Sequence, residues 1–166
     1  RIQILETQAQ HNLAVGILAS VSISFKGSVG YYCGGLMDGP NLEILGNAGW
    51  GLGESMLSGT IHVRGNAGNG CAASIRGGTV VIEGNSAARA GISMKGGLLI
   101  IGGSCGYMTG FMSQRGAVIV CGNAGPGLGD SMYEGCVYVG GEIQELGSDA
   151  VVQELEEKDW KFLSEK

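Results

Sequence analysis

The sequence predicts an all-β fold: a single-stranded right-handed parallel β-helix, or solenoid, of about seven 19-residue coils with a short C-terminal helix. Three observations predict this fold. Glycine makes up 33 of the 166 residues, glycines recur with a constant 19-residue period, and two apolar positions recur with them. The glycine content excludes helical bundles, because glycine costs about 1 kcal/mol at a helix-interior position relative to alanine.

Residues 1–20 precede the first repeat and form a lead-in segment. Seven repeats follow without an insertion or deletion, and together they make the predicted β-helix of residues 21–153. The repeats are residues 21–39, 40–58, 59–77, 78–96, 97–115, 116–134 and 135–153. A fixed period of this length is typical of a solenoid, in which neighbouring coils bury one continuous core.

Each repeat is predicted to begin with a short strand that points two apolar side chains inward. Residues two apart lie on the same face of a strand, and positions 3 and 5 of the repeat are apolar throughout. Position 3 holds Ile23, Leu42, Ile61, Val80, Leu99, Val118 and Val137, and position 5 holds Phe25, Ile44, Val63, Ile82, Ile101, Val120 and Val139. Each strand should pair with the same strand of the next coil, about 4.8 Å away. Crossovers between parallel strands favour the right-handed coil.

A structural turn glycine follows the strand at position 7 of every repeat. These glycines are Gly27, Gly46, Gly65, Gly84, Gly103, Gly122 and Gly141. Position 8 is asparagine in several repeats, and both residue types tolerate the left-handed backbone of tight turns. We therefore expect a turn here, with stacked amides that bond coil to coil. A second strand, with an inward side chain at position 17, and a second turn should complete each coil.

Residues 154–166 form a C-terminal tail that is predicted to be helical. Val152, Leu155 and Phe162 can share one face of such a helix. That face would be available to cover apolar surface on the last coils.

Position 4 points outward and changes from polar in the early repeats to apolar in the later ones. It holds Ser24, Glu43, His62, Val81, Ile100, Ile119 and Tyr138. An extended apolar surface marks a contact site, so either the tail or a partner subunit should cover the later repeats, and both can do so. The candidate partner interface comprises Ile100, Ile119 and Tyr138, with Tyr107, Phe111 and Arg89, at which the repeat departs from its consensus.

Charge and cysteine content restrict the class of protein. The net charge is −5, and no run of lysine and arginine suggests nucleic-acid binding. No apolar stretch reaches the roughly 20 residues that a membrane-spanning helix needs. The number of cysteines is odd and no Cys-x-x-Cys pair occurs, which is typical of a reduced, cytoplasmic protein.

The residues that could carry chemistry have a structural interpretation. Cys33 and Cys71 lie two coils apart, roughly 10 Å, beyond the limit of about 7 Å between Cα atoms in a disulfide. We expect the cysteines to be small buried residues. His62 should lie on the surface between Glu43 and Val81, and His11 has no ligand-forming neighbour in sequence. We therefore predict no catalytic, cofactor-binding or metal-binding residue in this chain.

The uninterrupted array of G-N-A-G-x-G-x-G turns resembles the Gly-x-Gly-x-Gly β-helix domain at the C-terminus of the large (alpha) subunit of glutamate synthase. The segments HNLAVGI (11–17), GYYCGG (30–35), GISMKG (91–96) and CGNAGPGLGDSMYEG (121–135) are most similar to stand-alone small subunits of glutamate-synthase-like complexes, such as N-methylglutamate synthase. A related domain is similar and forms one subunit of formylmethanofuran dehydrogenase.

The resemblance implies a structural role in glutamate biosynthesis and nitrogen metabolism. The subunit would lie between a glutamine-amidotransferase-like subunit and a synthase subunit that carries FMN and an iron–sulfur cluster, and would bind no cofactor itself. No residue of this chain matches a catalytic residue of that family. A homo-oligomer is a further expectation.

Two alternatives remain open at this point. The first is the equivalent scaffold of a formylmethanofuran dehydrogenase. The second is an acyltransferase built on a β-helix, with His62 as the base, although those helices repeat hexapeptides and 19 is not a multiple of six.

Overall fold

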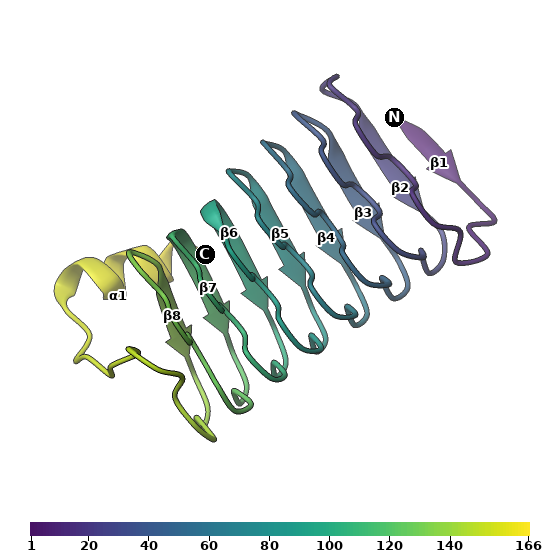
Figure 1. Ribbon diagram of the computed structural model, residues 1–166. Coiled ribbons are helices and arrows are strands. Elements are labelled where there is room, and N and C mark those ends of the chain that lie inside the picture. Colours follow the sequence, from purple (N-terminus) through teal and green to yellow (C-terminus); the bar gives the residue numbers. More distant parts are fainter.

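The computed structural model describes residues 1–166 as an elongated stack of coils (Figure 1). One sheet contains eight parallel strands, which lie side by side in chain order. The strands are β1 (Ile2–Ile4), β2 (Ser22–Phe25), β3 (Asn41–Ile44), β4 (Thr60–Val63), β5 (Thr79–Ile82), β6 (Lys95–Ile101), β7 (Arg115–Val120) and β8 (Cys136–Val139). A single helix, α1 (Glu157–Ser164), follows the last strand. The predicted parallel β-helix with a short C-terminal helix is confirmed.

The 19-residue repeat sets the register of the sheet. Leu42 of β3 pairs with Ile61 of β4, one full repeat later, and the other strands from β2 onward follow the same rule apart from an irregularity at the start of β6. Strand β1 differs, because Ile2 pairs with Ile23, an offset longer than one repeat. The lead-in segment thus adds a strand ahead of the seven repeats. The repeat pattern does not reveal this strand because its residues are out of phase with the rest.

Apolar side chains fill the inside of the coils. Positions 3, 5, 9 and 17 point inward, and 27 buried residues form one continuous cluster. Leu42, Ile61 and Val80 stack above one another with 2% or less of their surface exposed. Each buried side chain of this size contributes about 1.5–3 kcal/mol relative to an exposed one. In the last repeat Val137 and Val139 are only partly buried, because no further coil covers them.

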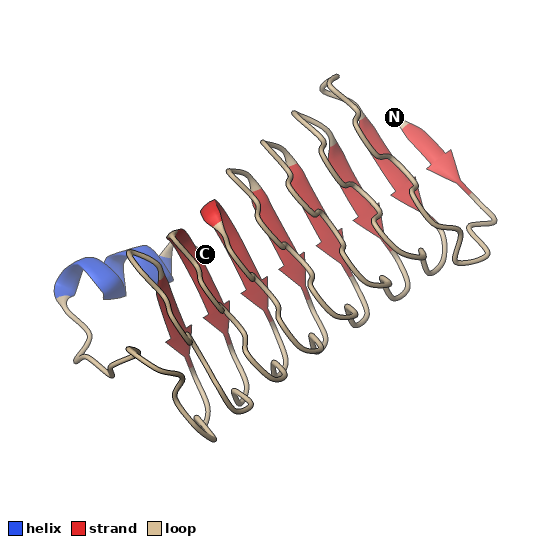
Figure 2. Cartoon of the chain, in the orientation of Figure 1, coloured by secondary structure: helices blue, strands red, loops and turns tan.

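Each coil contains one regular strand rather than the two that the repeat predicted. Position 9 forms only a single parallel bridge, as between Ala48 and Ala67. Positions 12, 14 and 16 commonly have positive φ angles, as at Ala72 and Ser74, and alternate left-handed residues do not continue a strand. The coils nevertheless remain bonded, since 75 of the 102 backbone hydrogen bonds lie outside the helix and strands. The turns therefore stack as regularly as the strands, along both edges of the sheet (Figure 2).

The tail returns to the outer face of the last strands. Helix α1 begins with a capping box between Glu156 and Asp159, and the ring of Phe162 lies 5.7 Å from that of Tyr138. Val152 and Leu155 precede the helix and are exposed. The expectation that they share a helical face with Phe162 is therefore wrong, because the helix starts only at Glu157.

Candidate functional site

The turn glycines at position 7 serve the contact between coils. None of the seven has a positive φ angle, so the expected left-handed turn is wrong at these positions. A side chain added at Gly65 would instead lie 2.8 Å from the carbonyl oxygen of Gly46 in the preceding coil. The other six glycines face a similar approach, closer than 3 Å, to an atom of the neighbouring coil. Glycine is required because the backbones of successive coils nearly touch.

The asparagines at position 8 form the expected ladder between coils. The backbone N–H of Asn66 donates to Oδ1 of Asn47 at 2.8 Å, and that of Asn85 donates to Oδ1 of Asn66 at the same distance. The donor is mainly the backbone rather than the side-chain amide that stacking suggested. These bonds join the coils at an exposed edge and leave no ligand site there.

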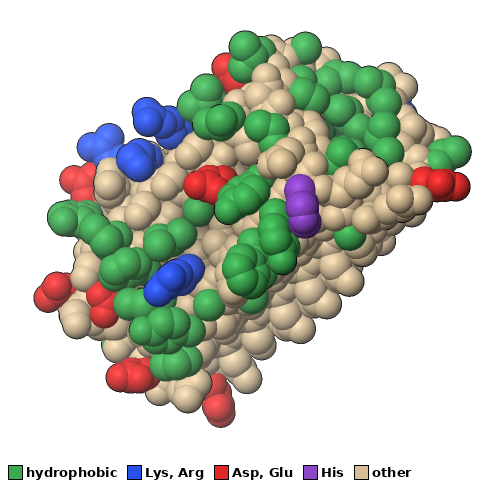
Figure 3. Space-filling view, turned by 45° about the vertical axis from the view of Figure 1, so that its right-hand side comes forward, with side chains coloured by type: hydrophobic (Ala, Val, Ile, Leu, Met, Phe, Trp, Pro, Cys, Tyr) green, Lys and Arg blue, Asp and Glu red, His purple; other side chains and the backbone are tan.

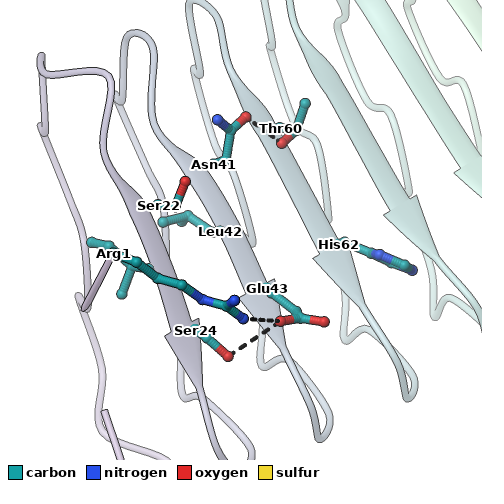
Figure 4. A pocket seen from close by; sticks show the side chains of 9 residues that line it. Arg1, Ser22, Ser24, Asn41, Leu42, Glu43, Thr60 and His62 are labelled. Carbon is teal, nitrogen blue, oxygen red and sulfur yellow. Dashed lines mark hydrogen bonds and ion pairs between the residues drawn. The ribbon is translucent and has the colours of Figure 1, made fainter. Parts of the chain in front are cut away.

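A polar groove of about 320 Å³ crosses the outer face of strands β2–β4 (Figure 4). Its polar lining residues are Arg1, Ser22, Ser24, Asn41, Glu43, Thr60 and His62. Glu43 lies near its centre, where Ser24 donates to it at 3.3 Å and the guanidinium of Arg1 lies 3.9 Å away. The groove is open to solvent and holds paired charges, so it offers a polar docking surface.

Arg64 links two carboxylates beside this groove. It donates to Glu43 at 3.2 Å and also to Glu83, whose carboxylate accepts a second contact from Nε2 of His62 at 2.9 Å. The hydrogen bonds from Arg64 are the main cause that lowers the pKa of both Glu43 and Glu83 below the ordinary value. Both groups are therefore anionic at neutral pH. The predicted outward position of His62, between Glu43 and Val81, is confirmed by the register.

The predicted apolar face of the later coils lies on strands β6–β8. Ile100 of β6 pairs with Ile119 of β7 on this face, and both are half-buried. Tyr138 is in contact with the tail, because its hydroxyl donates to Asp159 at 2.8 Å and its ring lies against Phe162. The tail thus covers the end of this face. Burial and the bond to Asp159 raise the pKa of Tyr138 to about 12.

Tyr107, Phe111 and Arg89 lie on a different surface from Ile100 and Ile119. They belong to the turn face, which we define as the outward side chains at positions 11, 12, 15 and 16 of the repeat. Tyr107 and Arg89 are exposed there, and Phe111 is half-buried. The single candidate interface predicted from sequence is therefore divided between the sheet face and the turn face.

The turn face also carries an aromatic stack that was not predicted from the sequence. His11 stacks on Tyr31 with ring centroids 4.4 Å apart, and Tyr31 stacks on Trp50 at 5.4 Å. The backbone N–H of Tyr31 also donates to Nδ1 of His11 at 2.8 Å. The aromatic residues at position 11 of the first two repeats were the available signal. Hydrophobic side chains accordingly gather in separate clusters on the molecular surface (Figure 3).

The five cysteines fall into two groups. Cys33, Cys71 and Cys105 are buried as expected, whereas Cys121 and Cys136 are exposed. The expectation of burial was wrong for these two, because positions 6 and 2 of the repeat point outward. Burial raises the pKa of Cys33 and of Cys71 to about 12. These two thiols therefore remain protonated and are poor nucleophiles or metal ligands.

No helix in the structure has the length and apolar character needed to cross a membrane.

Comparison with known proteins identifies the repeat. A family model described as the GXGXG motif matches residues 3–160, almost the whole chain, including strand β1 and part of α1. No curated protein matches the sequence.

Proposed function

The chain belongs to the GXGXG motif family, and from this premise we propose that it is a non-catalytic scaffold subunit of a glutamate-synthase-like complex in glutamate or N-methylglutamate metabolism. The observation that supports this proposal most strongly is the extent of the match. The repeat accounts for nearly all of the chain, and its coils are filled with packed side chains. What the chain offers to other molecules is therefore its outer surface.

The architecture suits a spacer between two enzymes. Seven steps separate the eight strands, which corresponds to a sheet roughly 34 Å long at about 4.8 Å per step. Every step carries backbone hydrogen bonds and continuous apolar packing. Partners bound to the two ends of such a solenoid would be held at a fixed distance.

In this proposal the chemistry belongs to the partners. A glutamine-amidotransferase-like subunit would release ammonia, and a synthase subunit would use it with FMN and an iron–sulfur cluster. This chain would bind neither cofactor. The protonated state of Cys33 and Cys71 is in keeping with that division, since cluster ligands are thiolates.

The sheet face of the later coils is the surface that we assign to the synthase complex. Ile100 and Ile119 are outward and half-buried, and the tail reaches the neighbouring Tyr138. A partner that covered this face would remove the remaining apolar surface from water, at about 25 cal/mol for each Å².

Co-purification from the native host tests the proposal. A tagged chain should retain an amidotransferase-like protein and a protein with the absorption of flavin and iron–sulfur, each identified by mass spectrometry. Recovery of a molybdopterin protein instead would support the formylmethanofuran dehydrogenase alternative. Recovery of the chain alone would contradict both scaffold assignments.

A pair of double variants locates the contact. Ile100→Asp with Ile119→Asp should abolish retention of the partners, because each aspartate would be desolvated without a counter-charge. Thr60→Asp with Thr79→Asp, on the polar coils of the same sheet, should retain them. Far-UV circular dichroism of both variants separates loss of contact from loss of fold.

A further inference from the structure

We infer that the turn face is a homodimer interface, on which a second copy of this chain binds in antiparallel orientation. The two-fold axis would pass between Cys71 and Ala72, in the middle of repeat 59–77. This interface lies apart from the sheet face that carries Ile100 and Ile119. The inference concerns the chain alone and does not depend on the proposed function.

The repeat fixes which residues would meet across such an axis. A two-fold rotation maps each coil onto one equally far beyond repeat 59–77, and it exchanges positions 12 and 15 as well as 11 and 16. Repeat 21–39 of one copy therefore faces repeat 97–115 of the other. Repeat 40–58 faces repeat 78–96. The contacts are reciprocal, as in any isologous dimer.

Apolar residues meet apolar residues under this rotation. Tyr32 would face Phe111 of the second copy, Leu36 would face Tyr107, and Tyr31 would face Met112. Apart from the half-buried Phe111, all of these side chains are between 41% and 58% exposed in the single chain. Exposed aromatic and methionine side chains in this arrangement are typical of interface anchors.

Charge follows the same symmetry. Glu54, at position 15 of repeat 40–58, would face Arg89, at position 12 of repeat 78–96 of the second copy. Neither residue has an ion-pair partner within the chain, whereas Arg64 and Arg115 do. The rotation brings these two unpaired charges together twice, once on each side of the axis. This complementarity selects a second copy of the chain over an unrelated partner.

Small residues lie around the axis itself. Repeat 59–77 presents Asn69, Gly70, Ala73 and Ser74 on the turn face, between the two apolar clusters. Asn69 would face Ser74, and Gly70 would face Ala73. The central coil therefore lets the two copies approach, while the larger side chains pack on either side of it.

Sedimentation equilibrium of the full chain tests the inference. The 17.0 kDa chain should sediment as a dimer. Glu54→Arg and Arg89→Glu should each raise the dissociation constant by about tenfold or more, since like charges would meet at two places. Mixing the two single variants should restore association, because every arginine then faces a glutamate of the other chain. The double variant should likewise associate with itself.

Lys26→Glu is the matched control, since it reverses an exposed charge away from the turn face and should leave the dimer unchanged. Trp50 gives an independent readout in a Trp160→Phe background. Its accessibility to acrylamide should fall as the wild-type chain associates and should stay high in Glu54→Arg. A monomeric wild-type chain would overturn the inference. So would a dimer that neither reversal weakens, or variants that fail to restore association when mixed.

Discussion

Gly65 and Gly70 lie in the same turn, but each requires glycine for a different reason. At Gly65 the φ angle is ordinary, and a methyl group would lie against the carbonyl of Gly46 in the preceding coil. At Gly70 the φ angle is +67°, and nothing lies within 4 Å of an added side chain. The first glycine allows the close approach of two coils, and the second allows a left-handed backbone.

Alanine substitution at the two positions should separate these causes. Gly70→Ala adds only left-handed strain and should cost about 1 kcal/mol. Gly65→Ala should cost more, about 1–3 kcal/mol or above, because the neighbouring backbone must move. Urea unfolding of the two variants and the wild type gives both differences. Equal losses of stability would contradict close approach as the role of position 7.

Thiol accessibility tests the burial of the cysteines. In the native protein a disulfide reagent should react rapidly with Cys121 and Cys136 only, since the other three thiols are buried and at least Cys33 and Cys71 have a pKa of about 12. All five should react after unfolding. Cys121→Ser with Cys136→Ser should abolish the rapid phase, whereas Cys33→Ser should leave it intact. A third rapidly reacting thiol would contradict this grouping.

At the scale of elements, helix α1 is held by few contacts. None of its residues is buried, and it is anchored to the sheet by the ring of Phe162 and the carboxylate of Asp159, both on Tyr138. An eight-residue helix is marginal alone. Docking on strand β8 therefore stabilises it, and this docking should depend on the protonation of one phenol.

We predict that alkali releases the helix. The docked state raises the pKa of Tyr138 to about 12, above about 10 for an unfolded tyrosine. Its contribution to stability is therefore complete below about pH 10 and is lost as the pH rises through about 12. The difference in phenolate absorption between wild type and Tyr138→Phe should show a group that ionises near this higher value. Tyr138→Phe should also speed tryptic cleavage at Lys158. An ordinary tyrosine midpoint would contradict the contact.

At the scale of the whole molecule, the solenoid is a sum of equivalent steps. Each strand pairs only with the strands before and after it, so stability should grow with coil number. The same side-chain columns continue across any complete repeat. Removal of one repeat should therefore bring matching surfaces together.

Deletion of residues 59–77 should leave a folded chain of lower stability. The deletion would place Val80 on Leu42 and the N–H of Asn85 beside Asn47, and so preserve both the core and the asparagine ladder. Deletion of residues 59–68 removes about half a coil and should prevent folding, because inward and outward positions would be exchanged or misaligned. Circular dichroism and urea unfolding distinguish the two. Similar behaviour of both deletions would contradict a core defined by the repeat.

Much of the fold could be predicted from sequence because the repeat itself states the contacts. A constant 19-residue period aligns Leu42 with Ile61 and then with Val80, so one apolar pattern predicts the strands, the register and the core together. The same pattern placed His62 on the surface. Prediction failed where the phase is lost, as at strand β1, and where a turn conformation replaces a strand, as at Ala72 and Ser74.

The candidate surfaces were predictable only in part. Sequence alone grouped Ile100 and Ile119 with Tyr107 and Arg89, although the structure places the two pairs on different sides of a coil. The exposure of Cys121 and the contact of Phe162 with Tyr138 were likewise beyond the pattern.

The sequence by itself thus determined a β-solenoid with a filled interior, because hydrophobic burial follows directly from periodic apolar residues. Only the tertiary structure decided why Gly65 must be glycine, where the tail binds, and that Glu54 and Arg89 lie symmetrically about one repeat. These depend on distances between coils and on the direction in which each outward side chain points. Periodicity fixes which residues are neighbours, but three-dimensional packing fixes which surfaces they share.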